Sequence, residues 1–197
     1  MLYPNLYSKR IILASKSPRR LELVRGLEIE PEVIVRDVDE SYPTSLTGVE
    51  VAKFVTLAKA SAYENMLEAD DVLITGDTVV LLEGEVLEKP ANSTDAASML
   101  RRLSGRTHIV ASGIAVTTLK EGKPMTSCEV DTCEVTFEEL TEEMIDHYIV
   151  QYKPFDKAGS YGVQDLIGFV GVSSINGSFY TVMGLPVHIL HKMLQEI

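Results

Sequence analysis

The sequence predicts an α/β fold, because short apolar segments of strand character alternate with amphipathic helices along the chain. A strand-rich segment occupies the centre, between residues 107 and 137. The length of 197 residues fits one domain, or two small lobes around a cleft. We therefore expect residues 1–197 to form a single α/β unit with two lobes.

The first half of the chain predicts a strand, a helix, a second strand and a long helix. Residues 11–14 are apolar, and Ser17 and Pro18 then provide an N-cap and a first helical position for a helix that stops at Gly26. A strand follows at 33–35, and then an acidic loop at 37–43. A capping box at 47–50 opens a helix with apolar residues as far as Met66.

The middle predicts two short strands, 72–74 and 78–82, on either side of Gly76 and Asp77, with a hairpin turn at 83–84. A helix is expected at 93–103, followed by strands at 108–118 and 129–137. Thr141 begins another helix, which ends at Lys153. Residues 159–177 are glycine-rich and predict loops with short strands, and Pro186 begins the last helix.

Composition narrows the functional class. The net charge of -11 argues against general nucleic-acid binding, although cations gathered in one cleft could still hold a small anion. No segment resembles a signal peptide or reaches the ~20 apolar residues of a membrane helix, so we expect a cytoplasmic protein without a membrane partner. Cys128 and Cys133 fall on opposite faces of one strand, which favours reduced thiols.

The segment SKSPRR at 15–20 is the first candidate site. It joins a buried strand to the start of a helix, where free backbone amides and the helix dipole favour an anion. Arg19 and Arg20 in the first turn are unfavourable for the helix dipole unless an anion is bound there. The alternative is a solvated surface helix.

Asp77 is the second candidate, since it follows an apolar strand and a glycine that lets a ligand approach. It could ligate Mg²⁺ or serve as a general base, or it could simply form a turn. Lys59, Lys89 and Lys157 lie in apolar or turn settings and are either surface lysines or phosphate ligands. The acidic loop 37–40 could complete a magnesium site beside Asp77.

Taken together, these motifs resemble the Maf family of nucleotide pyrophosphatases. The matching segments are LASKSPRR (13–20), DE (39–40), KA (59–60), GDTVV (76–80), EKP (88–90), MLRRLSGRTH (99–108), DKAGSYGVQ (156–164), GSFY (177–180) and GLP (184–186). The resemblance runs in order along nearly the whole chain. It departs from the family pattern at Gly76, Lys153 and Asp165, where Ala, Glu and Gly are usual.

The resemblance implies an extended mixed sheet with flanking helices and two lobes around a cleft, similar to the inosine triphosphatase (Maf/Ham) fold. It implies hydrolysis of dTTP and UTP between the α and β phosphates with a divalent cation, Mg or Mn, and a possible homodimer. Asp77 falls on the catalytic position, and Asp77 and Glu40 fall on the metal site. The other implied catalytic residues are Glu40, Lys59 and Lys89. The implied substrate-binding residues are Ser15, Arg19, Arg20, Thr78 and Gln164, of which Arg19, Thr78 and Gln164 mark the branch acting on dTTP and UTP.

Two other functions remain open from the sequence. One is a pyrophosphatase for modified or methylated nucleotides. The other is a regulatory nucleotide-binding protein with little turnover, linked to cell division. The combination of Asp77, Glu40 and the lysines favours catalysis, because a pure binding protein needs no carboxylate that activates water.

Overall fold

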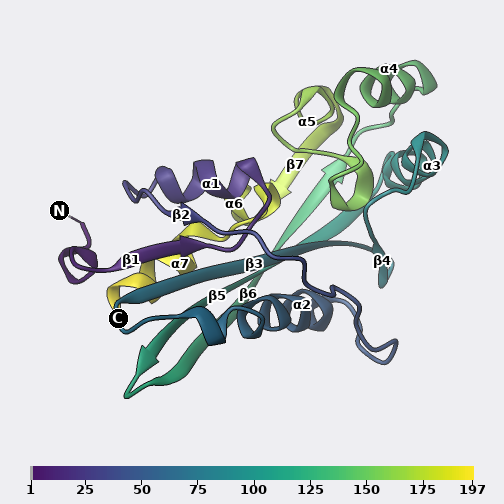
Figure 1. Cartoon of the computed structure of the whole chain (residues 1–197). Coiled ribbons are helices and arrows are strands. Elements are labelled where there is room, and N and C mark those ends of the chain that lie inside the picture. The colour runs from purple at the N-terminus through teal and green to yellow at the C-terminus, as the bar shows by residue number, and fades with distance from the viewer. Residues whose placement is uncertain (1) are drawn as a thin grey trace.

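A seven-stranded mixed sheet organises the computed structural model, which describes residues 2–197 (Figure 1). The strand order is β2-β1-β3-β5-β6-β7, with β4 pairing to the end of β3. β1 runs parallel to β2 and β3, and all other pairs are antiparallel. The strands are β1 (Arg10–Leu13), β2 (Glu32–Val33), β3 (Asp71–Leu82), β4 (Glu85–Leu87), β5 (Thr107–Lys120), β6 (Lys123–Phe137) and β7 (Val172–Asn176).

Helices cover both faces of this sheet. α2 packs on one face against β3, β5 and β6, whereas α6 and α7 pack on the other face against β5 (Figure 1). The helices are α1 (Pro18–Arg25), α2 (Val49–Ser61), α3 (Ser93–Leu103), α4 (Glu142–Tyr152), α5 (Leu166–Gly171), α6 (Phe179–Met183) and α7 (Val187–Gln195). Short 3₁₀ turns lie at Pro4–Leu6, Glu64–Met66 and Ala158–Ser160. The predicted extended mixed sheet with flanking helices is confirmed.

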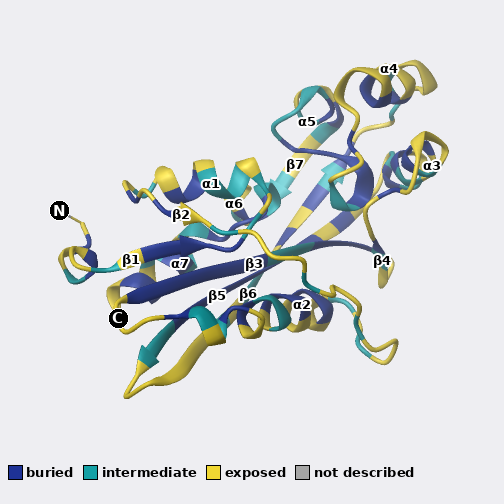
Figure 2. Cartoon of the chain, in the orientation of Figure 1, coloured by how far each residue is buried: buried dark blue, intermediate teal, exposed yellow. Residues whose placement is uncertain are grey.

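Two large apolar clusters at opposite ends of the long strands form the two predicted lobes. One joins β1, α1 and α7 to the first half of β3, and the other joins α3, α4 and α5 to its second half. β3 and β5 run through both and are buried over most of their length, whereas the tip of the β5–β6 hairpin is exposed (Figure 2). The two lobes therefore share the strands β3 and β5.

The structure corrects several predicted boundaries. β3 continues through Gly76 and Asp77 instead of breaking there, because the strand stays paired with β5, where Asp77 faces Gly113. α2 ends at Ser61, and Gly48 rather than Thr47 occupies its N-cap position, although the Thr47 N–H still donates to Glu50 Oε2 at 3.1 Å. β6 begins earlier than predicted, at Lys123, because it pairs with β5 along its full length. The glycine-rich segment 159–177 also contains a short helix, α5.

The edge of β3 that faces β1 carries a gap in the sheet. β1 ends at Leu13, opposite Ile74, and β4 begins to pair only at Val80. Within the described chain, residues 75–79 therefore have no strand neighbour on this side. The gap leaves room for a ligand beside Asp77 and Thr78, at the end of the parallel strand β1, where open α/β sheets commonly bind ligands.

No helix within residues 2–197 is both long and apolar enough to cross a membrane.

Candidate active site

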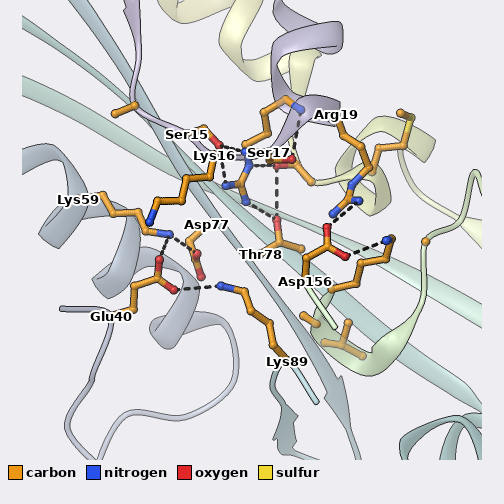
Figure 3. Close-up of a pocket in the computed structure, with 18 of the residues that line it drawn as sticks. Ser15, Lys16, Ser17, Arg19, Glu40, Lys59, Asp77, Thr78, Lys89 and Asp156 are labelled. Carbon is orange, nitrogen blue, oxygen red and sulfur yellow. Dashed lines mark hydrogen bonds and ion pairs between the residues drawn. The ribbon is translucent and has the colours of Figure 1, made fainter. Parts of the chain in front are cut away.

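A cavity of about 360 Å³ lies over the gap beside β3, within the range usual for small-molecule sites. Its walls come from the β1–α1 junction, the acidic loop, α2, β3, and the loops at 156–164 and 182–184. All of the site residues predicted from the sequence line this cavity: Ser15, Arg19, Arg20, Glu40, Lys59, Asp77, Thr78, Lys89 and Gln164. Figure 3 labels all of them except Arg20 and Gln164.

Carboxylates and lysines alternate at one end of the cavity, which we call the charged end (Asp77, Glu40, Lys59 and Lys89). Lys59 Nζ lies 2.7 Å from Asp77 Oδ1 and 2.9 Å from Glu40 Oε1. Lys89 Nζ lies 3.2 Å from the other oxygen of Glu40. The side chains of Lys59 and Asp77 are only 12% and 14% exposed, so their attraction is weakly screened by solvent.

In the structure the Lys59 ammonium bridges the carboxylates of Asp77 and Glu40. Together with Lys89, which pairs with Glu40, the formal charges of the charged end balance. Burial raises the pKa of Glu40, but hydrogen bonding and charge attraction from Lys59 and Lys89 outweigh it and hold that pKa below its usual range. Glu40 is therefore ionised at neutral pH.

The N-terminus of α1 forms a second wall. Ser17 Oγ accepts the N–H of Arg20 as predicted for an N-cap, and Ser15 Oγ accepts the N–H of Ser17 at 3.1 Å. Pro18 occupies the first turn, where its missing N–H costs no hydrogen bond. The remaining free amides and the dipole of α1 favour negative charge at this wall.

Arg20 reaches from α1 across the gap in the sheet. Its guanidinium donates to Gly184 O at 2.8 Å, to Thr78 Oγ1 at 3.1 Å and to Ser15 Oγ at 3.5 Å. Burial lowers the pKa of Arg20, and the nearby charge of Asp77 opposes this. Among residues 2–197 no carboxylate forms an ion pair with Arg20, so its charge remains available to an anionic ligand.

Arg19 points to the other side of the cavity, toward the second lobe (Figure 3). Its Nη1 lies 3.5 Å from Asp156 Oδ2, and Lys157 Nζ lies 2.8 Å from the other Asp156 oxygen. Arg19 therefore connects α1 to the loop at 156–164, which precedes α5.

Gln164 lines the cavity on the loop that also carries Asp156 and Lys157. We call the wall formed by Tyr161, Gly162 and Gln164 the recognition end. Gln164 Oε1 is buried, and no hydrogen-bond partner for it exists in the described chain. Tyr161 is buried and its hydroxyl lies 2.7 Å from Nε2 of His108, a residue of β5. This wall is aromatic and largely neutral.

Gly76 does not serve the role expected from the sequence. A Cβ at this position would lie 2.8 Å from Gly113 O, on the neighbouring strand. The missing side chain thus permits close pairing of β3 with β5, rather than the approach of a ligand.

Comparison with known proteins identifies the family of this chain. The Maf-like protein family model matches residues 10–197. This chain belongs to the Maf family. It is 47% identical to a protein of Phocaeicola vulgatus named dTTP/UTP pyrophosphatase, with 98% of each chain covered. It is 43% identical to a protein of the same name from Porphyromonas gingivalis, over 98% of this chain and 96% of that one.

Among solved structures, the Staphylococcus aureus Ham1 protein matches 66% of this Maf-family chain and 72% of its own, with 16% identity and a TM-score of 0.48. A likeness at that level carries no argument about the site.

Sequence reasoning missed part of the recognition end. Asp156 carries no signal beyond its place in a motif, and nothing in the sequence around Tyr148 of α4 singles it out. Tyr148 is fully buried, but its hydroxyl donates to Asp165 Oδ2 at 2.8 Å and accepts the Gly162 N–H at 3.0 Å. Only the three-dimensional contact reveals this role.

Proposed function

We propose that this Maf-family chain is a nucleoside triphosphate pyrophosphatase that hydrolyses dTTP and UTP to dTMP or UMP and pyrophosphate. One observation carries the proposal: the carboxylates of Asp77 and Glu40 share a cavity with Lys59, Lys89 and the cationic start of α1. The names of relatives at 43–47% identity support the same substrates.

The charges of the cavity suit a triphosphate. Arg20 has no carboxylate partner among the described residues, and the N-terminus of α1 lies beside it. Lys59 and Lys89 are held near Asp77 by carboxylates and can turn to phosphate oxygens when these arrive. Cations placed where negative charge develops on the leaving pyrophosphate lower the barrier to its departure.

In the reaction, a water oxygen bonds to the α phosphorus and the bond from this phosphorus to the α–β bridging oxygen breaks. Pyrophosphate leaves with the bonding electron pair. Asp77 is the proposed base that orients the water and accepts its proton. Lys59 donates to Asp77 Oδ1 at 2.7 Å and holds the carboxylate in place.

The donor set also fits a divalent cation, Mg or Mn, when substrate is bound. Residues 2–197 contain no cluster of three or more potential metal ligands, but Asp77 and Glu40 converge on one cation, the Lys59 ammonium. Mg²⁺ is commonly held by one or two carboxylates together with substrate phosphates. When bound, the metal would supply positive charge at the phosphates and acidify a coordinated water.

Gln164 is the proposed reader of the base. Its carboxamide has a donor and an acceptor, and uracil and thymine present a carbonyl acceptor and an N–H donor along one edge. Cytosine presents a different pattern and is disfavoured. The buried Oε1 of Gln164, which has no protein partner in the described chain, supports this assignment.

A product analysis in ¹⁸O-labelled water tests the proposed reaction. Purified protein with Mg²⁺ and dTTP should form equal amounts of dTMP and pyrophosphate, with the label in dTMP, because water attacks the α phosphorus. Formation of dTDP and orthophosphate, or label only in pyrophosphate, would contradict it. Full turnover in excess EDTA would contradict the metal.

A panel of nucleotides separates the alternatives. Preference for a methylated or otherwise modified base over dTTP and UTP would favour the modified-nucleotide enzyme. Tight binding without turnover would favour the regulatory protein.

We also propose that the protein acts in the cytoplasm on free nucleotides, with neither nucleic acid nor a membrane as partner, and that it forms a homodimer. Light scattering of the purified protein tests the dimer, and a monomeric mass at micromolar concentration would contradict it.

A further inference from the structure

The side chain of Gln164 has no hydrogen bond among the described residues that fixes which way its carboxamide faces. It lies in the loop between the 3₁₀ turn Ala158–Ser160 and α5. The Asp165 N–H donates to Gly162 O at 3.0 Å and closes a turn in which Gln164 is the third residue. The orientation of Gln164 therefore depends on how this turn is held.

One hydroxyl holds the turn at both of its ends. Tyr148 extends from α4 through the core, donates its O–H to Asp165 Oδ2 at 2.8 Å and accepts the Gly162 N–H at 3.0 Å. Gly162 lies close to the side chains of Gln164 and Asp165. A Cβ at this position would lie 2.6 Å from Asp165 Oδ2 and 2.9 Å from Gln164 Nε2.

The Asp165 carboxylate sets the direction of these hydrogen bonds. Its Oδ2 accepts the Tyr148 O–H, so the Tyr148 oxygen is left to accept the Gly162 N–H. Lys157 Nζ lies 3.8 Å from the same Asp165 oxygen. The side chains of Lys157 and Asp165 are only 11% and 16% exposed, so solvent competes little with these contacts.

We infer that Tyr148 and Asp165 are positioning residues for base selection, which hold the turn 162–165 so that Gln164 faces the base. The inference rests on the proposed function, because it assumes that Gln164 reads a pyrimidine. Neither residue lines the cavity, so both act through Gln164. Their loss should therefore change which base is accepted far more than the rate of the chemical step.

The chain offers a matched pair of variants as a test. Tyr148→Phe deletes the hydroxyl that holds the turn. Tyr152→Phe deletes a hydroxyl from the same helix, on a ring that stacks against Tyr148 with centroids 5.0 Å apart. Tyr152 is 42% exposed, and in the described part of the chain its hydroxyl makes no hydrogen bond. Both proteins are assayed with UTP and CTP at a temperature where each is fully folded.

We expect Tyr148→Phe to lower the UTP-to-CTP ratio of kcat/KM by about three- to tenfold, the size of one lost hydrogen bond. The change should come from a higher KM for UTP, with kcat within about twofold of wild type. Tyr152→Phe should leave the ratio unchanged. Equal ratios in the two variants, or a fall in kcat that is the same for both nucleotides, would overturn the inference.

Asp165 variants provide a second, independent arm. Asp165→Asn keeps an oxygen that can accept from Tyr148 and should retain most of the selectivity, whereas Asp165→Ala should lose it. A selective Asp165→Ala enzyme would overturn the inference.

Amide exchange of the segment 160–166 separates this inference from the proposed function. It should accelerate in Tyr148→Phe and not in Tyr152→Phe, whatever the enzyme hydrolyses. A wild-type protein that leaves UTP intact refutes the proposed function. A wild-type enzyme that is active on UTP, combined with a Tyr148→Phe variant of unchanged exchange and selectivity, refutes only the inference.

Discussion

The charged end and the recognition end of the cavity are built on opposite principles. At the charged end, Lys59 and Lys89 hold Asp77 and Glu40 through ion pairs, and Glu40 and Lys89 are about half exposed. Behind the recognition end, the side chains of Tyr148 and His108 are buried and hold its residues by hydrogen bonds, Tyr148 to Gly162 and His108 to Tyr161. The exposed pair of Lys89 and Glu40 exchanges partners readily, whereas buried hydrogen bonds are costly to break.

This difference matches what each end must do. Phosphates and a divalent cation can enter the charged end only if the lysines release their carboxylates. A base is selected best by a wall that does not move, because a preorganised site loses little conformational freedom on binding. The comparison predicts that substitutions at the charged end change turnover, whereas those at the recognition end change stability and selectivity.

Asp77→Asn should produce the largest effect. The substitution keeps the size of the side chain but removes its charge and basicity, so kcat should fall by about 10²-fold or more. Nucleotide binding should survive, since Arg19, Arg20, Lys59 and Lys89 remain. Steady-state kinetics, a thermal melt and a nucleotide titration measure these three properties.

Asp70→Asn is the matched control for Asp77→Asn. Asp70 pairs with Lys9 at 3.0 Å, but its side chain is 70% exposed and does not line the cavity, so kcat should stay near the wild-type value. An Asp77→Asn protein that melts normally and keeps more than about a tenth of wild-type kcat would exclude Asp77 as the catalytic base.

His108 should make the recognition end sensitive to acid. Burial lowers the pKa of His108 to about 4, from 6.5. Between these pH values the unfolded chain binds a proton that the folded chain does not, so the free energy of unfolding falls as pH falls from about 6.5 to 4. The loss should total about 3 kcal/mol, at 1.36 kcal/mol per pKa unit.

Denaturant unfolding across this pH range tests the contribution of His108. The His108→Gln protein should show a flatter dependence on pH than wild type, whereas His147→Gln, which changes an exposed histidine of α4, should follow wild type. Parallel curves for wild type and His108→Gln would show that His108 is not held neutral in the fold.

Gln164→Ala should lower the UTP-to-CTP ratio of kcat/KM. Loss of the hydrogen bonds between Gln164 and the base should remove about 1–3 kcal/mol of discrimination between the two nucleotides, with little change in kcat. Gln151→Ala, on the exposed surface of α4, serves as the control. If the ratio for Gln164→Ala equals that for Gln151→Ala, another residue reads the base.

The sequence predicts the charged end better than the recognition end, and the reason is physical. Ser17 and Pro18 mark the start of α1, Arg20 breaks the usual charge preference of its first turn, and Asp77 stands out as a carboxylate beside an apolar strand. The link between Tyr148 and Gly162 depends on how α4 packs against a distant turn, and no local pattern encodes this. The pairing of Lys59 with Asp77 was missed for the same reason, since it joins α2 to β3 across 18 residues.

The loop that carries Glu40 is tied down by one further contact, between Tyr42 and Glu88. The Tyr42 hydroxyl donates to Glu88 Oε1 at 2.7 Å, and Glu88 directly precedes Lys89, the partner of Glu40. Burial, followed by the hydrogen bond to Glu88, raises the pKa of Tyr42 to about 12. The hydroxyl therefore remains a donor throughout the physiological pH range.

Tyr42→Phe should have the smallest effect of the four substitutions. Glu88 is exposed, so water can replace the lost hydroxyl and the cost should stay below about 1 kcal/mol. Glu40 would be held less firmly, and we expect the Mg²⁺ concentration for half-maximal activity to rise by about twofold to fourfold while kcat at saturating Mg²⁺ stays the same.

Tyr7→Phe, at a side chain that is 81% exposed and does not line the cavity, is the control. A Tyr42→Phe enzyme with the Mg²⁺ dependence of Tyr7→Phe would show that the two ion pairs of Glu40 hold the loop without help. A loss of kcat as large as that of Asp77→Asn would show that the loop is rigid, contrary to the contrast between the two ends of the cavity.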